Sequence, residues 1–287
     1  MVVKALGLLY AIWGFNWVVM KEATLFFPPL TFAGYRMLSA ALVLLLVSAW
    51  FRLPPPPRQY WPWLAITGLL QITVNMGAVQ VGMESLPAGL VAVLNYSMPV
   101  WMAVLAYFFL SEPLTKRKIG GIIACMVGMV LLMNVSSLGS VTGMVITIGG
   151  AVAWAIAGVV LKRHPLGKEC SMLQFTTWQI VIGSLVLWGI SLTEEGAVTW
   201  NLMAVICVAY NGILASAVAF FLWNYILTHM EAGKASVAVL GVPVVGVLCS
   251  LIFLGEALQW HTAFGMILIL AGIFCIVAPL GFSRKMK

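Results

Sequence analysis

The sequence predicts an all-α integral membrane protein of ten transmembrane helices, arranged as two inverted-topology repeats of five. Composition, recurring apolar runs and an internal duplication lead to this fold class. Of the 287 residues, 63% are hydrophobic and 8% are charged, whereas a soluble domain has roughly 25% charged residues. Backbone groups in lipid must be hydrogen-bonded internally, so apolar runs of about 20 residues are expected to be helices rather than strands.

Polar, proline and glycine clusters divide the chain into segments with short connections, none long enough for a soluble domain. The first segment contains Trp13 and Asn16 and is followed by no small-residue cleavage site, so we expect a spanning helix rather than a signal peptide. The expected helices are residues 3–20, 31–50, 60–82, 86–110, 116–133, 140–160, 170–191, 200–228, 232–254 and 260–280.

Basic residues predict the orientation of these helices. With the amino terminus in the cytoplasm, the loops on the opposite side receive only Lys21, and both termini become cytoplasmic. The basic clusters lack the aromatic readers of a nucleic-acid surface, and the five cysteines show no metal-like spacing. The residues assigned to the cytoplasmic side are Lys4, Arg52, Arg58, Lys116, Arg117, Lys118, Lys162, Arg163, Lys168, Lys234, Arg284, Lys285 and Lys287.

Residues 86–131 recur as residues 230–275 at a shift of 144 positions. A further match at a shift of 141 superposes Trp13 on Trp154 and Lys21 on Lys162. Each half, residues 1–137 and 138–287, therefore holds five spans, and an odd number makes the second copy enter the membrane from the opposite face. The 144-residue shift superposes Ala88, Gly89, Pro99, Leu110, Glu112, Gly121 and Gly128 on Ala232, Gly233, Pro243, Leu254, Glu256, Gly265 and Gly272.

Polar and aromatic side chains at mid-membrane depth should face the interior of the bundle. Their concentration in the first, third, fourth, sixth and eighth helices favours a lined cavity, although amides could simply link helices and aromatic rings fill the bundle. The candidate substrate-binding residues are Asn16, Trp17, Gln71, Asn75, Asn95, Tyr96, Trp101, Trp154 and Asn211.

Two prolines and one arginine interrupt the apolar helices. Pro99 and Pro243 each remove a backbone hydrogen bond, so a kink is expected there, serving either as a hinge or as a packing feature. Arg36 is the one charge at appreciable depth. Snorkelling outward is its default explanation, and a pair with a carboxylate or the substrate is the alternative.

The residue types that the sequence lacks, or scatters, argue against several classes of function. The chain has no Asp, its Glu residues fall at or near expected helix ends, and His164, His229 and His261 are dispersed. Neither a buried proton relay, a metal centre nor an enzyme's reactive cluster is visible, and no continuous polar stripe of a channel is present. We expect no enzyme activity, no cofactor and no metal.

Paired motifs carry a resemblance to a known family. The runs Phe109–Leu114 and Phe253–Leu258 each contain Leu-x-Glu-x-Leu and are each followed by Gly-x6-Gly. Together with the two prolines and the early Trp13-Gly14, they resemble the EamA family of the drug/metabolite transporter superfamily. The aromatic interior is most similar to the YddG-type aromatic amino acid exporters.

The resemblance implies export of amino acids, aromatic ones included, across a bacterial inner membrane by alternating access. Multidrug or other metabolites, nucleotide sugars among them, remain the alternative cargo. Related small multidrug exporters use a carboxylate in their first helix for proton coupling. Trp and Asn stand in that helix here, so facilitated export is at least as plausible as antiport. The expected partners are a small-molecule substrate and membrane lipid, and a monomer is compatible with these features.

Overall fold

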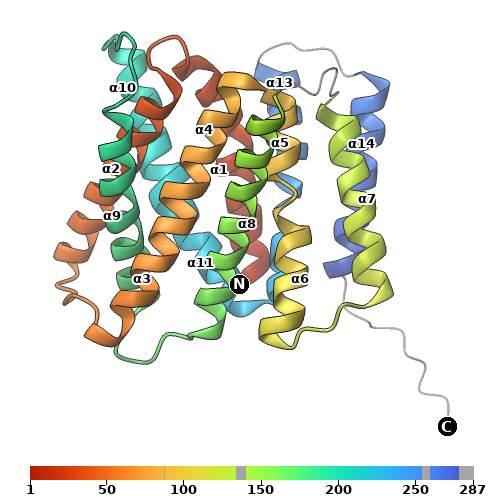
Figure 1. Cartoon of the computed structure of the whole chain (residues 1–287), viewed down its shortest axis with the longest axis horizontal. Coiled ribbons are helices and arrows are strands. Elements are labelled where there is room, and N and C mark those ends of the chain that lie inside the picture. Colours follow the sequence, from red (N-terminus) through yellow and green to blue (C-terminus); the bar gives the residue numbers. More distant parts are fainter. Residues whose placement is uncertain (87, 134–139, 254–258, 278–287) are drawn as a thin grey trace.

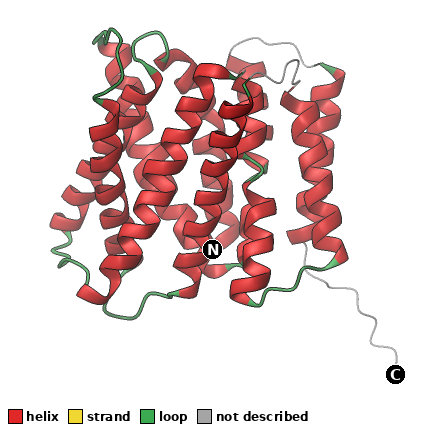
Figure 2. Ribbon diagram, viewed as in Figure 1, coloured by secondary structure: helices red, strands yellow, loops and turns green. Residues whose placement is uncertain are grey.

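The computed structural model describes residues 1–86, 88–133, 140–253 and 259–277, and within these ranges the regular structure is entirely helical (Figures 1 and 2). Some side chains inside the helices fall outside the description: Trp17, Lys21, Ala88, Gly89, Leu132, Met133, Ser250 and Phe253.

The first half of the chain runs back and forth across the bundle. Its third pass is a continuous rod of two α-helices joined by a π-helix, and its fourth pass is two separate helices. The elements are α1 (Val2–Ala23), α2 (Pro29–Trp50), the short η1 (Arg58–Tyr60), α3 (Trp61–Gly68), the π-helix η2 (Leu69–Val74), α4 (Asn75–Ser85), α5 (Ala88–Asn95), α6 (Met98–Leu110) and α7 (Lys116–Met133).

The second half repeats this order, including a π-helix in its third pass and a break in its fourth. The elements are α8 (Val141–Arg163), α9 (Met172–Ser191), α10 (Leu202–Ala209), the π-helix η3 (Tyr210–Val218), α11 (Ala219–His229), α12 (Ala232–Ala238), α13 (Gly241–Phe253) and α14 (Trp260–Val277). Each helix falls close to a range expected from the sequence.

The two prolines break their helices instead of kinking them, which corrects the sequence prediction. The expected helix 86–110 is divided into α5 and α6, and the expected helix 232–254 contains both α12 and α13. Pro99 and Pro243 lie in the first turn of the second piece, where a missing N–H costs nothing and a fixed φ suits the helix. Each proline therefore starts a new helix after a short turn.

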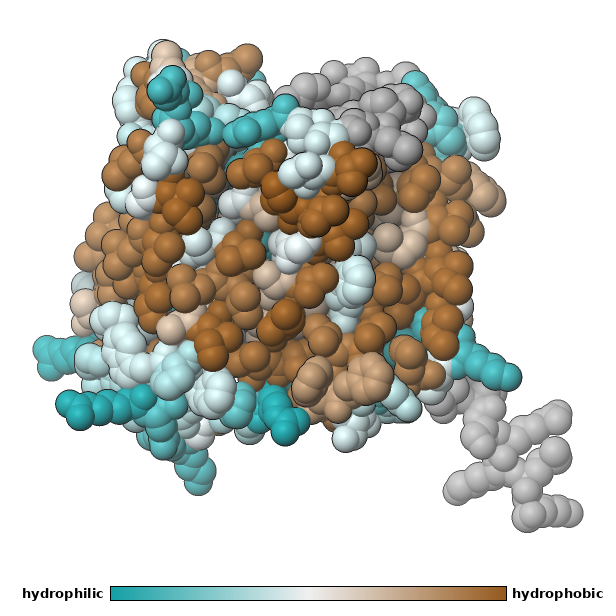
Figure 3. Space-filling view, viewed as in Figure 1, coloured by the Kyte–Doolittle hydropathy of each residue, from teal (hydrophilic) through white to brown (hydrophobic). Residues whose placement is uncertain are grey.

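The outer surface has the character expected in a bilayer. Figure 3 shows apolar side chains over most of the visible face, with hydrophilic ones gathered toward its two edges. In the described part of the chain, nine helical segments are long and apolar enough to cross a membrane. The helix α7 is outside this set because it begins with Lys116, Arg117 and Lys118.

The two ends of the bundle differ in charge. The helices α1 and α14 begin and end, respectively, at the lower end in Figure 1, where α6 also gives way to α7. We call this the basic end, because its helix termini and connections contain Arg52, Arg58, Lys116, Lys162 and Lys168. The turn from α1 to α2 and the end of α4 lie at the opposite end.

The helices α7 and α14 pack backbone to backbone through the repeated glycines. A Cβ added to Gly128 would lie 2.7 Å from the Gly265 carbonyl oxygen, and one added to Gly272 would lie 2.7 Å from that of Gly121. The Gly-x6-Gly pattern thus gives each helix one smooth face, and the two faces meet.

Helix contacts elsewhere recur between the halves. The contact of α1 with α13 corresponds to that of α8 with α6, and the contact of α2 with η3 corresponds to that of α9 with η2. The pairs α2–α9 and α7–α14 join helices that are each other's counterparts. The packing therefore follows the duplication read from the sequence.

Candidate functional site

A cavity of about 120 Å³ lies inside the bundle, far more than the roughly 10–15 Å³ that one water needs. Its lining comes from the second half of α1, the second turn of α2, the helix α4 and the turn between α5 and α6. The middle of α8, the start of α11 and the turn between α12 and α13 complete it. It therefore occupies the middle of the bundle and extends toward the opposite end. The lining residues are Trp13, Asn16, Met20, Arg36, Met76, Val79, Gln80, Met83, Asn95, Tyr96, Met98, Trp154, Phe220 and Val239.

Aromatic rings form one wall of this cavity. Trp13 and Trp154, which superpose in the duplication, meet edge to face with their ring centroids 6.1 Å apart. Phe220 stacks on Trp154 at 5.8 Å and lies edge-on to Trp13 at 6.1 Å. Rings that hold one another at these distances present a rigid apolar surface.

Hydrogen bonds fix both tryptophans in place. The Trp13 indole nitrogen donates to the Ala215 carbonyl oxygen at 2.8 Å. With the Gln71 amide turned so that its oxygen faces the indoles, that oxygen accepts from Trp154 Nε1 and Trp223 Nε1, each at 2.9 Å. Gln71 lies against Gln179, with their amides 2.8 Å apart. The wall is therefore supported by a buried polar network behind it.

Both supports of the wall come from π-helices. Gln71 belongs to η2 and Ala215 to η3. The first residue of η2, Leu69, superposes on the first residue of η3, Tyr210, at the shift of 141 that also relates the two tryptophans. A π-helix displaces the backbone by part of a turn and is frequent at functional sites. The duplication therefore preserved both the wall and its two supports.

The turn between α5 and α6 supplies polar groups to the cavity. Asn95 ends α5, Tyr96 lies in the turn and Met98 begins α6, so the break directs all three to the lining. Asn75 Nδ2 donates to Asn95 Oδ1 at 2.8 Å. This bond orients the Asn95 amide from the neighbouring helix α4.

Arg36 does not snorkel, which corrects the default expectation from the sequence. Its residue is only 5% exposed and lines the cavity. Its Nε donates to Ser216 Oγ at 3.2 Å, and Nη1 lies 3.9 Å from the weak acceptor Met20 Sδ. The guanidinium is therefore held inside the bundle at the polar side of the cavity.

The candidate residues from the sequence fall into four groups. Those that line the cavity are Asn16, Asn95, Tyr96 and Trp154. Those buried behind or beside the lining are Gln71, Asn75 and Asn211. Trp101 is outside the lining, 37% exposed on α6, and donates to Ser97 Oγ. The Trp17 side chain lies outside the described residues.

Several lining residues were not singled out by the sequence. The helix α4 contributes Met76, Val79, Gln80 and Met83, whose spacing of three, four and seven places them on one helix face. That spacing was the available signal. It was hidden because valine and methionine also occur on exposed faces of apolar helices in this chain, as Met203 and Val205 do.

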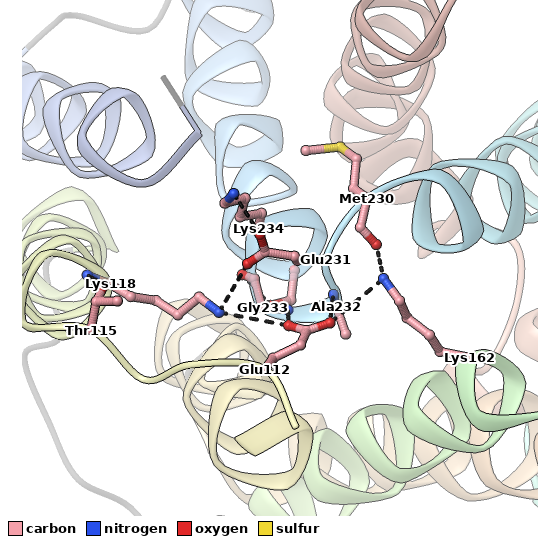
Figure 4. Close-up of polar contacts among 10 residues, drawn as sticks. Glu112, Thr115, Lys118, Lys162, Met230, Glu231, Ala232, Gly233 and Lys234 are labelled. Atoms are coloured by element: carbon pink, nitrogen blue, oxygen red, sulfur yellow. Dashed lines mark hydrogen bonds and ion pairs between the residues drawn. The ribbon is translucent and has the colours of Figure 1, made fainter. Parts of the chain in front are cut away.

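At the basic end lies a group of buried and partly buried charges that we call the Glu112 cluster: Glu112, Lys118, Lys162 and Glu231 (Figure 4). Glu112 Oε1 lies 3.5 Å from Lys162 Nζ, and Glu112 Oε2 lies 3.6 Å from Lys118 Nζ. Lys118 also pairs with Glu231 at 3.4 Å, and Lys162 donates to the Met230 carbonyl oxygen. The cluster joins the ends of α6 and α8 to the starts of α7 and α12.

Glu112 also caps a helix of the other half. Its carboxylate accepts from the backbone N–H of Ala232 at 2.6 Å and of Gly233 at 3.1 Å. A carboxylate at a helix N-terminus satisfies orphan donors and complements the helix dipole. The sequence placed Glu112 at a helix end, as found, but did not predict that it is only 8% exposed.

Glu231 completes the cluster toward solvent. Its hydrogen bond with Lys234, at 2.7 Å, is the main cause that lowers the pKa of the Glu231 carboxyl, assisted by the charge of Lys118. A lowered pKa keeps the carboxylate charged at neutral pH. The described residues contain no group of three His, Cys, Asp or Glu side chains that could hold a metal ion.

A helical bundle with several long apolar helices, an internal and partly polar cavity and an ion-pair cluster at one end has the features of a membrane transporter. The sequence model of the EamA-like transporter family matches the chain twice, over residues 3–134 and 141–278. The chain belongs to this family, which confirms the family expected from the paired Leu-x-Glu-x-Leu motifs. A transporter family also agrees with the expectation that the chain is not an enzyme.

Relatives of similar length match along nearly the whole chain. The "Uncharacterized transporter YvbV" of Bacillus subtilis is 29% identical, with 98% of this chain and 92% of the relative covered. The "Probable amino-acid metabolite efflux pump" of Salmonella typhimurium is 25% identical over 93% of this chain and 91% of its own length. One solved crystal structure, 15% identical, has a TM-score of 0.81 and covers 96% of this chain and 95% of its own, which shows the shared fold.

Proposed function

We propose that this chain is a secondary transporter of the bacterial inner membrane that exports amino acids, aromatic ones included, by alternating access. The observation that carries the proposal is the cavity itself, in which an aromatic wall faces polar groups on Arg36, Asn16 and Asn95. Two relatives, from Salmonella typhimurium and Escherichia coli, are named as probable amino-acid metabolite efflux pumps. Both features fit a cargo with an apolar side chain and a charged backbone.

The proposed topology has ten spans in two inverted repeats of five, divided near residue 137, with both termini in the cytoplasm. The contacts exchanged between the halves support the repeat. The basic residues gathered at one end support the orientation. Cysteines introduced at Arg58 and at Glu195, which lie in connections at opposite ends, should be labelled by an impermeant maleimide from the inside and the outside, respectively. Labelling of both from the same side would contradict the inverted topology.

In the proposed transport cycle, the described conformation is closed at the basic end. The Glu112 cluster connects elements of both halves there, while the cavity extends toward the other end. Opening to the cytoplasm then requires the ion pairs between α6, α7, α8 and α12 to separate. Pro99 and Pro243 lie at the two helix breaks where such motion could be accommodated.

We propose facilitated export rather than proton antiport. Among the described residues that line the cavity, the only ionisable side chains are those of Arg36 and Tyr96, and none is a carboxylate. Efflux of amino acid from preloaded proteoliposomes, measured with and without an imposed pH gradient, tests this. Strong stimulation by inward protons would overturn the uncoupled mechanism.

A second candidate cargo is a broader set of hydrophobic drugs or other metabolites. The specific observation is that Met20, Met76, Met83 and Met98 line one cavity. Methionine is flexible and polarizable, so such a lining adapts to ligands of different shape. A competition screen in proteoliposomes that includes both amino acids and hydrophobic cations separates the two candidates.

Two tryptophans, one in the aromatic wall of the cavity and one outside the lining, provide matched variants for this screen. Trp154→Ala removes a lining ring, whereas Trp101→Ala removes a ring outside the lining. We expect the first variant to raise the KM for aromatic amino acids more than that for alanine, and the second to leave both unchanged. Equal effects of the two variants in well-folded protein would contradict the assignment of the wall.

A further inference from the structure

The polar side of the cavity contains a buried cation without a carboxylate partner. Arg36 pairs with no Asp or Glu among the described side chains, and its polar contacts are with a hydroxyl and a thioether. A charge buried at membrane depth is costly unless an opposite charge or several hydrogen bonds compensate it. Arg36 is therefore arranged to receive an anion from the cavity.

The shape of the guanidinium narrows the kind of anion. Its fork of N–H groups matches the two oxygens of a carboxylate, which can accept two parallel hydrogen bonds. Ser216 Oγ accepts from Nε and so fixes one edge of the group. This leaves the terminal nitrogens to meet a ligand.

A buried acceptor on α1 lines the same cavity. Asn16 is 7% exposed and lines the cavity, and its Oδ1 has no hydrogen-bond partner among the described atoms. A buried polar atom left without a partner costs roughly 1–3 kcal/mol, so a donor is expected at this position when the cavity is filled. An ammonium group is such a donor.

Apart from Gln80, Asn95 and Tyr96, the remaining lining is apolar. Trp13, Trp154 and Phe220 present rings on one side, and α4 presents Met76 and Met83. A ligand with charged groups but no apolar part would make no contact with this apolar surface. An apolar side chain attached to both charges would fill it.

We infer that the cargo is an α-amino acid with an apolar side chain, whose carboxylate binds Arg36 and whose ammonium group donates to Asn16 Oδ1. This inference rests on the proposed function and names the residues that would recognise the charged part of the substrate. Arg36 selects for the carboxylate, and the aromatic and methionine surfaces accept the side chain.

The test compares three probes of the same shape with different charges, measured as competitors of radiolabelled phenylalanine and by direct binding to protein in nanodiscs. L-Phenylalanine carries both groups, 3-phenylpropionate lacks the ammonium group, and phenethylamine lacks the carboxylate. Leucine, 4-methylpentanoate and isoamylamine form a second set. Wild-type protein should bind the amino acid more tightly than either partner lacking one group.

Two cavity variants and one control assign the contacts. Arg36→Gln should weaken binding of phenylalanine and 3-phenylpropionate by about tenfold or more, the effect of losing a hydrogen bond to a charged group, and leave phenethylamine unchanged. Asn16→Leu should weaken phenylalanine and phenethylamine but not 3-phenylpropionate. Arg58→Gln, at an exposed arginine, should change none of them.

Each outcome decides the inference. If Arg36→Gln weakens all three probes equally, or if the wild type binds phenethylamine as tightly as phenylalanine, the carboxylate contact is wrong. If Arg36→Gln does not fold, the wild-type probe series and Arg36→Lys, which keeps the charge, still decide. If the protein transports amino acids but binds the three probes equally tightly whatever their charge, the proposed function stands and this inference is wrong. Arg36-dependent binding of 3-phenylpropionate without amino acid transport would overturn the proposed function and the amino acid as cargo, and would leave only the contact of Arg36 with a carboxylate.

Discussion

The two helix breaks have the same backbone plan but different surroundings. At the first, between α5 and α6, Asn95, Tyr96 and Met98 line the cavity. At the second, between α12 and α13, the superposed residues are Val239, Leu240 and Val242. All three are apolar and at most 4% exposed, and Val239 alone of the three lines the cavity. Duplication thus preserved the break, while the polar chemistry stayed with one copy.

At each break a backbone carbonyl oxygen accepts a hydrogen bond from a side-chain hydroxyl, and the two hydroxyls come from different places. At the first break the Leu94 carbonyl oxygen accepts from Ser97 Oγ at 2.6 Å, within the same turn. Its counterpart, that of Ala238, accepts from the Tyr10 hydroxyl of α1. The first break satisfies its own backbone, whereas the second is tied to another helix.

The difference follows from two substitutions between the copies. Ser97 superposes on Gly241, where a Cβ would lie only 2.8 Å from Tyr10 Cζ. Tyr10 superposes on Ala151 at the shift of 141, and alanine carries no hydroxyl to offer the first break. The second break is therefore a fixed anchor, and the first is free to serve the cavity.

The largest expected effect concerns the start of α12, which Glu112 caps. Glu112→Ala removes the carboxylate between two lysines and two backbone N–H groups, and breaking such a buried ionic network costs ~3–5 kcal/mol. We expect the free energy of unfolding in mixed detergent micelles to fall by this amount. The control Glu84→Ala, at an exposed glutamate, should stay within about 0.5 kcal/mol of wild type. Equal losses would show that Glu112 does not anchor the second break.

A smaller effect is expected when the second break is given the residue of the first. Gly241→Ser places a side chain where Tyr10 lies, and overpacking of this kind costs ~1–3 kcal/mol. The reverse change, Ser97→Gly, removes the local bond to the Leu94 carbonyl oxygen and the exposed bond from Trp101 Nε1, and should cost about 1 kcal/mol. Thermal unfolding of the two variants compares them. A larger loss for Ser97→Gly would invert the assignment of anchor and free break.

Removing the two hydroxyl groups that donate to these carbonyl oxygens tests the same comparison further. Tyr10→Phe leaves the buried Ala238 carbonyl oxygen without its hydroxyl donor, which should cost about 1–3 kcal/mol. Ser97→Ala should cost less, because the Ser97 amide still donates to the Leu94 carbonyl oxygen at 3.2 Å. The free energies of unfolding of both variants, measured in the same detergent, check the order. A cost for Ser97→Ala at or above that of Tyr10→Phe would contradict it.

The sequence predicted the helices and the positions of both breaks because these depend on local properties. Apolar length sets the helices, and a proline cannot continue the hydrogen-bond ladder of a helix. The register of the duplication was readable because Pro99 and Glu112 are rare letters in an apolar chain. The break in place of a kink was missed, since local sequence does not reveal what satisfies the freed carbonyl groups.

The inward faces of the helices were harder to predict. Every face of α6 is apolar, so periodicity did not tell that Trp101 lies outside the cavity lining. Arg36 was expected to reach for water, and only the tertiary position of Ser216, on the opposite half of the chain, gives it a partner inside. The π-helices that support the tryptophan wall likewise depend on tertiary packing, of η2 against α9 and of η3 against α2, which no local pattern records.

The smallest expected effects concern the prolines themselves. Pro99→Ala and Pro243→Ala restore an N–H that could let each helix run on through its break, so the variants should impair the conformational change more than the binding of cargo. We expect the maximal rate of counterflow in proteoliposomes to fall by up to about tenfold, ~1.4 kcal/mol in the barrier, with the KM little changed. Since the second break is anchored and the first is free, Pro99→Ala should have the larger effect on rate. A rise in KM at constant rate would remove the hinge role, and a larger effect for Pro243→Ala would place the moving break in the second copy.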